Sequence, residues 1–138
     1  MKTFTLSIVL VSVLILAGIW WQDARSQGDP NVISRNGLHW HPTLEMYVKG
    51  VKQEIPENIG LGAIHQPVHT HDDLPKIHLE LSGTVRREDI LLGEFFKSWQ
   101  RDIRSFGSNM KMTVNGEENT EYENYMMRDG DRIELRYE

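Results

Sequence analysis

The chain of 138 residues contains no cysteine. Disulfide bonds, thiolate metal ligands and thiol redox chemistry are therefore excluded, and so is acylation at a lipoprotein cysteine. A domain without disulfides must hold itself together by side-chain packing, or by packing together with a bound metal ion. Any metal site in this sequence has to be built from histidine, carboxylate or methionine side chains.

Basic residues are also scarce relative to acidic ones. The 15 lysines and arginines against 20 aspartates and glutamates give a formal net charge of −5 at pH 7. A protein that binds nucleic acid needs a concentrated positive surface to neutralise phosphates. We therefore expect no nucleic-acid partner, and we interpret the acidic surplus as a solvated surface that keeps the domain soluble.

Signatures of common enzyme classes are missing as well. The sequence has no HExxH motif, no Ser-His-Asp order, no phosphate-binding loop and no dinucleotide fingerprint. The pair His69 and His71 matches a cupin metal motif poorly, because the nearest following glutamate is Glu80. We therefore do not expect an enzyme. A small metalloenzyme with Glu80 or Asp72 as general base is kept as an open alternative.

One long apolar run stands near the N-terminus. Residues 4–21 carry no charged side chain, and a run of about 18 mainly apolar residues can cross a bilayer core as a helix. Because Lys2 precedes the run, the positive-inside rule predicts that residues 1–21 are a membrane anchor with the rest of the chain outside the cytoplasm. A signal sequence cleaved after Ala17 or Ala24 is the rival interpretation. Both interpretations give the same compartment.

The segment after this run is polar. Residues 22–37 include Gly28, Pro30 and Gly37, and we predict that they form a tether. Residues 38–138 are then sufficient for one domain with a modest core.

Five of the six histidines gather in short clusters. In each cluster two potential ligands stand two positions apart: His39 and His41, His69 and His71, His78 and Glu80. Side chains two apart in an extended segment point to the same face, so each cluster aims two ligands in one direction. If the strand at 38–48 lies beside the strand at 77–82, and the loop at 65–75 folds back over them, these ligands converge.

Such a ligand set predicts a transition-metal site. Imidazole nitrogens with oxygen donors suit copper(II), zinc(II) or nickel(II), and the extracytoplasmic location favours copper first and zinc second. We predict the six clustered residues as ligands, with Glu80 or Asp72 as an oxygen ligand or as a support that orients a histidine. Two alternatives stay open: a hydrogen-bonded polar face without metal, or a structural metal that clamps the loop to the sheet. His65 stands apart, and we interpret it as structural. We also interpret Met110 and Met112 as core residues, although thioethers could bind Cu(I).

Hydrophobic periodicity predicts several strands and one helix. Alternating residues predict strands at 38–48, 51–55, 77–81, 110–114 and 133–137, the first two forming a hairpin. Apolar residues at helical spacing predict a helix over 87–103 that ends before Gly107.

This order of elements resembles the β-grasp (ubiquitin-like) pattern. The resemblance is specific near the C-terminus, where the Asn115-Gly116 turn and the closing DGDRIELRY are similar to the ends of sulfur-carrier domains. The chain lacks their terminal Gly-Gly, so conjugation chemistry is not implied. The resemblance implies an α+β fold: a β-grasp-like mixed sheet with one packed helix, here preceded by a single N-terminal transmembrane helix. Residues 63–76 would be a histidine-rich insertion.

The sequence also resembles a group of small, membrane-anchored, extracytoplasmic, histidine-rich proteins of unassigned function. Their motifs, HWHP, HTHD followed by IHxE, and LGxFFxxW, correspond here to His39–Pro42, His69–Glu80 and Leu92–Trp99. The resemblance covers most of residues 38–138. It implies a fold and a compartment more than an activity.

Together these features predict a membrane-tethered, extracytoplasmic protein that binds copper or zinc in metal handling, that is, sensing, buffering or delivery. The alternative is a non-enzymatic adaptor domain that docks to a membrane complex, with the histidines as contact residues or as a pH-responsive surface. The expected partners are the membrane, through the N-terminal segment, and a protein partner or a second copy of the chain.

Overall fold

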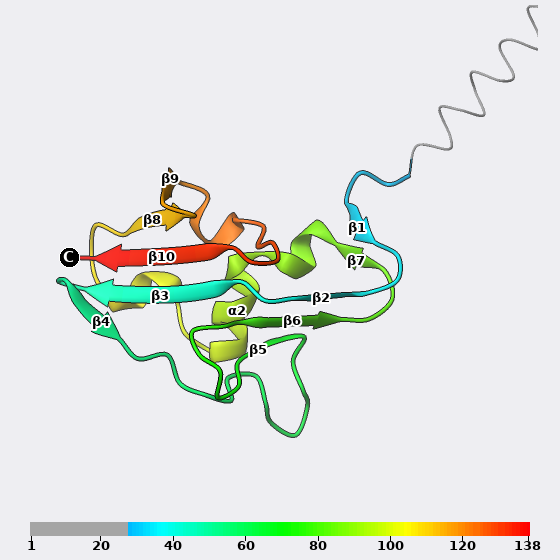
Figure 1. Cartoon of the computed structure of the whole chain (residues 1–138), viewed down its shortest axis with the longest axis horizontal. Helices are drawn as coiled ribbons and strands as arrows, with labels where there is room; N and C mark the ends of the chain where they lie inside the picture. Colours follow the sequence, from blue (N-terminus) through cyan, green and yellow to red (C-terminus); the bar gives the residue numbers. More distant parts are fainter. Residues whose placement is uncertain (1–27) are drawn as a thin grey trace, which may run out of the picture. The chain divides into compact units, whose positions relative to one another are not determined.

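The computed structural model describes residues 28–138. The chain separates into two units, residues 1–32 and residues 33–138. The architecture below belongs almost entirely to the second unit (Figure 1). The predicted membrane anchor or signal sequence, residues 1–21, lies outside the described residues.

The described residues form short strands with a few helical segments between them. The strands are β1 (Val32–Ser34), β2 (Leu38–Trp40), β3 (Thr43–Val48), β4 (Val51–Gln53), β5 (Val68–His69), β6 (His78–Leu81), β7 (Val85–Arg86), β8 (Lys111–Val114), β9 (Glu117–Asn119) and β10 (Arg132–Tyr137). The helical segments are η1 (Arg87–Ile90), α2 (Leu92–Trp99), η2 (Ile103–Phe106) and η3 (Tyr122–Asn124). β1 falls within the range predicted as a tether.

These strands are distributed over three sheets. The largest has five strands in the order β4-β3-β10-β8-β9, with β3 and β10 as parallel neighbours at its centre (Figure 1). A second sheet has three strands in the order β2-β6-β5, all antiparallel. β1 and β7 form a third, two-stranded sheet. The three-stranded sheet carries the histidine clusters.

β2 and β3 are consecutive in the chain but belong to different sheets. His41 and Pro42 separate them, and proline has no backbone N–H to continue a ladder. The carbonyl of Pro42 instead accepts a hydrogen bond from the N–H of Ile77 at 2.8 Å. This contact holds the start of β6 beside the end of β2, where the site is built.

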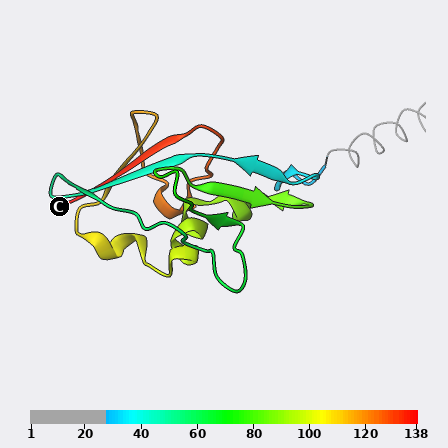
Figure 2. The same ribbon diagram turned by 60° about the horizontal axis from the view of Figure 1, so that its bottom comes forward.

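The sheets and α2 share one hydrophobic core. Alternate residues of the five-stranded sheet, including Leu44 and Leu135, are fully buried, and Leu79 of β6 is fully buried in the same cluster. α2 contacts β5 and η3 and lies on one side of the strands (Figure 2). Burying a large aliphatic side chain contributes about 1.5–3 kcal/mol, so this core accounts for much of the stability of a domain without disulfides.

The expected fold class is wrong. Sheet is the main regular structure of the described residues, at 37%, and α2, with eight residues, is their one α-helix of seven residues or more. The strands divide among three sheets, whereas a β-grasp-like single mixed sheet with one packed helix was expected. Within residues 28–138, no helix is both long enough and apolar enough to cross a membrane.

The helix predicted over 87–103 is broken into two helical segments, η1 and α2, and η2 begins only at its last residue. Leu91 is extended, with φ −71° and ψ 146°, and forms an isolated bridge with Met126 between η1 and α2. Gln100 ends α2 in the left-handed conformation, with φ 56° and ψ 36°. Three apolar residues of α2 still face the core, so the periodicity located the buried face but overestimated the length.

Two predicted pairings are confirmed. β3 and β4 form the antiparallel hairpin, with Val48 opposite Val51 across the turn. β2 lies beside β6, with His39 opposite Glu80, as the convergence of the histidine clusters requires.

Candidate metal centre

The three-stranded sheet has one apolar and one histidine-bearing face. Its central strand, β6, reads His78-Leu79-Glu80-Leu81, so its side chains alternate between the two faces. Leu79 is buried in the core, while His78 and Glu80 point to the other side. The neighbours continue this pattern, because His39 of β2 pairs with Glu80 and His69 of β5 pairs with His78.

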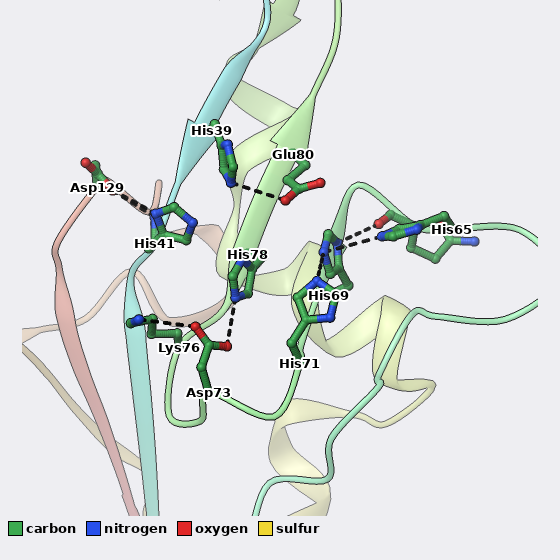
Figure 3. Close-up of polar contacts among 11 residues, drawn as sticks. His39, His41, His65, His69, His71, Asp73, Lys76, His78, Glu80 and Asp129 are labelled. Carbon is green, nitrogen blue, oxygen red and sulfur yellow. Dashed lines mark hydrogen bonds and ion pairs between the residues drawn. The ribbon is translucent and has the colours of Figure 1, made fainter.

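His78 lies between histidines of both neighbouring segments (Figure 3). On one side, the rings of His41 and His78 meet edge to face with centroids 4.8 Å apart. On the other side, the rings of His69 and His78 are stacked within 14° with centroids 5.5 Å apart. The register of the strand pairs, and not proximity in the sequence, therefore brings the clusters at 39–41 and 69–71 to the cluster at 78–80.

All six histidines form one continuous run of ring contacts. The successive centroid distances along it are 4.4 Å for His65–His69, 4.8 Å for His69–His71, 4.7 Å for His71–His78, 4.8 Å for His78–His41 and 4.6 Å for His41–His39. Residues more than 35 positions apart in the sequence thus share one patch of imidazole nitrogens.

Within this run, two sets of residues could hold a metal ion. The inner group consists of His69, His71, His78 and Glu80, and the outer group consists of His39, His41 and His78. In each group the potential ligand atoms lie within 4.8 Å of one another. These two groups contain all six residues predicted as ligands from the sequence.

His69 is oriented like a metal ligand. It is fully buried, and its Nδ1 lies 3.0 Å from the carbonyl oxygen of Gln66. Because a carbonyl can only accept, Nδ1 carries the proton, and Nε2 of the neutral ring carries the lone pair. A backbone carbonyl that fixes the tautomer in this way is a usual support for a metal-binding histidine. Burial also lowers the pKa of His69, which favours the neutral form that binds metals.

The lone pair of His69 faces a second ring. Nε2 of His69 lies 3.1 Å from Nε2 of His71. Two ligands about 2.0–2.1 Å from a tetrahedral zinc ion lie about 3.3–3.4 Å apart, so this spacing needs little change to accommodate an ion. Without an ion, the proton between the two nitrogens belongs to His71, since His69 carries its own proton on Nδ1.

His78 contributes a buried nitrogen. Its Nε2 lies 2.9 Å from Oδ1 of Asp73, which also pairs with Lys76 at 3.1 Å. A carboxylate oxygen accepts, so His78 donates from Nε2. This hydrogen bond is the main cause that lowers the pKa of Asp73 to about 2. Nδ1 of His78 is then the lone-pair nitrogen. It is buried and has no hydrogen-bond partner among the described residues.

The outer group is more open to solvent. The side chain of His39 is 61% exposed, and its Nε2 lies 3.2 Å from Oε1 of Glu80. The side chain of His41 is 37% exposed, and its backbone N–H donates to Oδ1 of Asp129 at 2.8 Å. Glu80 therefore belongs to the inner group and also contacts a histidine of the outer group.

A cavity adjoins the inner group. It has a volume of about 500 Å³, and its lining includes His65, Glu80, Ser82, Thr84 and Asp89. Of the inner group, only Glu80 lines this cavity, and His69 is fully buried.

Sequence reasoning missed two residues of this site. His65 was interpreted as structural, but its Nε2 lies 3.4 Å from Nε2 of His69. The spacing of four residues between two histidines in one loop is the signal that could have found it. Asp73 was passed over in favour of Asp72, and nothing in the sequence distinguishes the two adjacent carboxylates. Met112, by contrast, is buried in the core, as interpreted.

Comparison of the chain with protein-family models, with curated proteins and with solved structures finds no match. Function therefore has to be inferred from the chemistry of the site. Imidazoles and the carboxylate of Glu80 form groups that could hold a metal ion, and the carboxylate of Asp73 orients one of the imidazoles.

Proposed function

We propose that the protein binds a first-row transition-metal ion through the histidine face of the β2-β6-β5 sheet. The observation that supports this most strongly is Nδ1 of His78, a buried nitrogen without a hydrogen-bond partner among the described residues. A buried polar atom left unsatisfied costs about 1–3 kcal/mol, and native proteins contain few of them. A metal ion shared with His69 and His71 would satisfy this nitrogen.

Copper is the first candidate and zinc the second. The ligands of both groups are imidazoles, joined in the inner group by one carboxylate, and the chain has no thiolate. Such N/O ligand sets bind copper(II) most tightly among divalent first-row ions, while zinc(II) accepts the same donors in a tetrahedral arrangement. The measured preference between the two ions decides this part of the proposal.

The proposed role is metal handling outside the cytoplasmic membrane. The compartment is inferred from the apolar run at residues 4–21, and proteolysis of the domain on intact cells tests it. Sensing, buffering or delivery suits a site whose ligands range from buried to exposed, because an ion must be able to enter and leave. The acidic net charge also attracts cations toward the domain.

The experiment is a titration of tag-free protein, purified without metal-affinity resin, with copper(II) and with zinc(II). The double variant His69→Ala/His71→Ala should lose about 100-fold or more in affinity, since both ligands are removed. Arg136→Gln, which breaks a surface pair with Glu134 on the five-stranded sheet, serves as a matched control and should bind like the wild type. Equal affinity of the double variant and the wild type would refute the proposal.

One observation favours a second candidate, an adaptor. β4 stands at an edge of the five-stranded sheet, and its Val51 is 65% exposed. Exposed strand edges can accept a partner strand. A partner whose capture persists in a strong chelator, and is lost on Val51→Lys, would support this function over metal binding.

A further inference from the structure

The inner and outer groups of ligands share a residue of one strand, β6. His78 belongs to both the inner and the outer group, and Glu80 belongs to the inner group while contacting His39 of the outer one. His78 and Glu80 both lie on β6, which runs between β2 and β5 (Figure 3). The histidine pairs on either side therefore flank one shared ligand, His78.

His78 can serve only one ion at a time. Its Nε2–H is donated to Asp73 at 2.9 Å, which leaves Nδ1 as the nitrogen with a lone pair. One imidazole lone pair forms one metal–nitrogen bond. An ion held by His78 in the inner group thus removes the buried ligand of the outer group, and the reverse is also true.

The burial of the histidine side chains increases from β2, over β6, to β5. The exposed fraction of the side chain is 61% at His39, 37% at His41 and 11% at His78, and His69 has no exposed surface. An ion arriving from solvent meets the outer group on an open surface. The inner group offers one more ligand than the outer group. His71 is half-buried and Glu80 is exposed, but His69 is fully buried, and a bond between an ion and a buried ligand is stronger.

We propose that the histidine face is a transfer path for one metal ion, which is captured by the outer group and passes to the inner group while remaining bound to His78. This inference rests on the proposed function. In the transfer, the bonds from the ion to His39 and His41 break and bonds to His69 and His71 form. The proton on Nε2 of His71 moves to its Nδ1 through solvent. The charge and oxidation state of the ion do not change.

The shared ligand makes the transfer possible without release into solvent. If the two groups had no residue in common, an ion would have to lose every protein ligand before binding again. With His78 retained, only the flanking pair is exchanged. Glu80 changes partner at the same time, from the ring of His39 to the ion in the inner group.

The test is rapid mixing of the full-length protein with copper(II), supplied as a weak glycine complex and followed by visible absorption. Wild-type protein should bind one ion per chain in two phases, a fast one for capture and a slower one for transfer. His39→Ala/His41→Ala should reach the same final spectrum but about tenfold more slowly, without the fast phase. His69→Ala/His71→Ala should show the fast phase alone.

A control and three results decide the outcome. Arg136→Gln, which breaks a surface pair on the five-stranded sheet, is the control and should load like the wild type, and circular dichroism checks that each variant is folded. Two ions bound at once by the wild type would overturn the inference. Loading of the His39→Ala/His41→Ala variant at the wild-type rate would overturn it too. If the wild type binds no copper or zinc at all, the proposed function fails as well, which distinguishes the two failures.

Discussion

The five-stranded and three-stranded sheets use the same alternation for different purposes. Both turn apolar residues toward the shared core, Leu135 in one and Leu79 in the other. On the outer face of the five-stranded sheet, the charged residues satisfy one another: Glu45 accepts from Lys52 and Tyr47, and Arg136 pairs with Glu134. On the outer face of the three-stranded sheet, imidazole rings face one another and one buried nitrogen has no partner among the described residues.

This difference separates stability from function. A face of paired charges is complete by itself, and each exposed pair contributes only about 0.2–1 kcal/mol. A face of converging lone pairs contributes most of its stabilisation of the folded state when a cation binds to it. The first sheet should therefore be insensitive to metals, while the second should be stabilised by them.

The largest expected effects come from the core face that the two sheets share. Leu79→Ala and Leu135→Ala each remove a fully buried side chain, so each should lower the free energy of unfolding by about 2–5 kcal/mol. Urea unfolding of the metal-free variants measures this. A loss below about 0.5 kcal/mol at Leu79 would mean that the three-stranded sheet does not share the core.

The residue beside Leu79 should behave in the opposite way. His78→Ala removes the ligand common to both groups, so metal affinity should fall about 100-fold or more. The metal-free protein should lose much less stability than with Leu79→Ala, because the variant also removes an unsatisfied buried nitrogen. Metal titration and urea unfolding of the same His78→Ala preparation measure the loss of affinity and the loss of stability. Undiminished affinity would break the contrast between the two faces.

A smaller effect is expected from the carboxylate behind His78. Asp73→Asn keeps the shape of the side chain but replaces the charged acceptor of the Nε2 hydrogen bond. Loss of a residue that orients a metal ligand costs about 10–100-fold in affinity. Calorimetric titration with zinc(II) measures the change, with Asp72→Asn as the matched control. If the two variants bind equally well, Asp73 does not orient the ligand.

The smallest effect concerns acid. The pKa of Asp73 is lowered from 3.8 to about 2, first by its hydrogen bond with His78. A lowered pKa in the folded state contributes stability above pH 4 that is lost as the pH falls toward 2. The metal-free wild type should therefore lose stability more steeply between pH 4 and pH 2 than Asp73→Asn. The difference should be small because Asp73 is partly exposed. If the free energies of unfolding of the two proteins fall in parallel between pH 4 and pH 2, the contact between Asp73 and His78 does not contribute to stability.

Local patterns predicted the strand faces and the residues that could hold a metal ion, because both depend on alternation within a few residues. The alternation of His78, Leu79 and Glu80 is enough to assign the histidine face and the core face of β6. The extent of the helix could not be predicted in the same way. Its break at Leu91 depends on a bridge with Met126, which lies far away in the sequence.

Long-range contacts also explain the other gaps. The division into separate sheets depends on Pro42 and on the hydrogen bond that its carbonyl accepts from Ile77, a tertiary contact without a local signature. The choice of Asp73 over Asp72 depends on the path of the loop before β6. Periodicity carries no information about which of two adjacent residues points inward when the segment is irregular.

The central claim is that the histidine face binds a transition-metal ion through His78 and its neighbours. X-ray absorption at the metal edge of the loaded, tag-free protein tests it most directly, because it counts imidazole ligands around the ion. We expect about one tightly bound copper or zinc ion per chain with about three imidazole nitrogens, and about one fewer in His78→Ala. An ion surrounded mainly by water oxygen, or the same spectrum with and without His78, would contradict it.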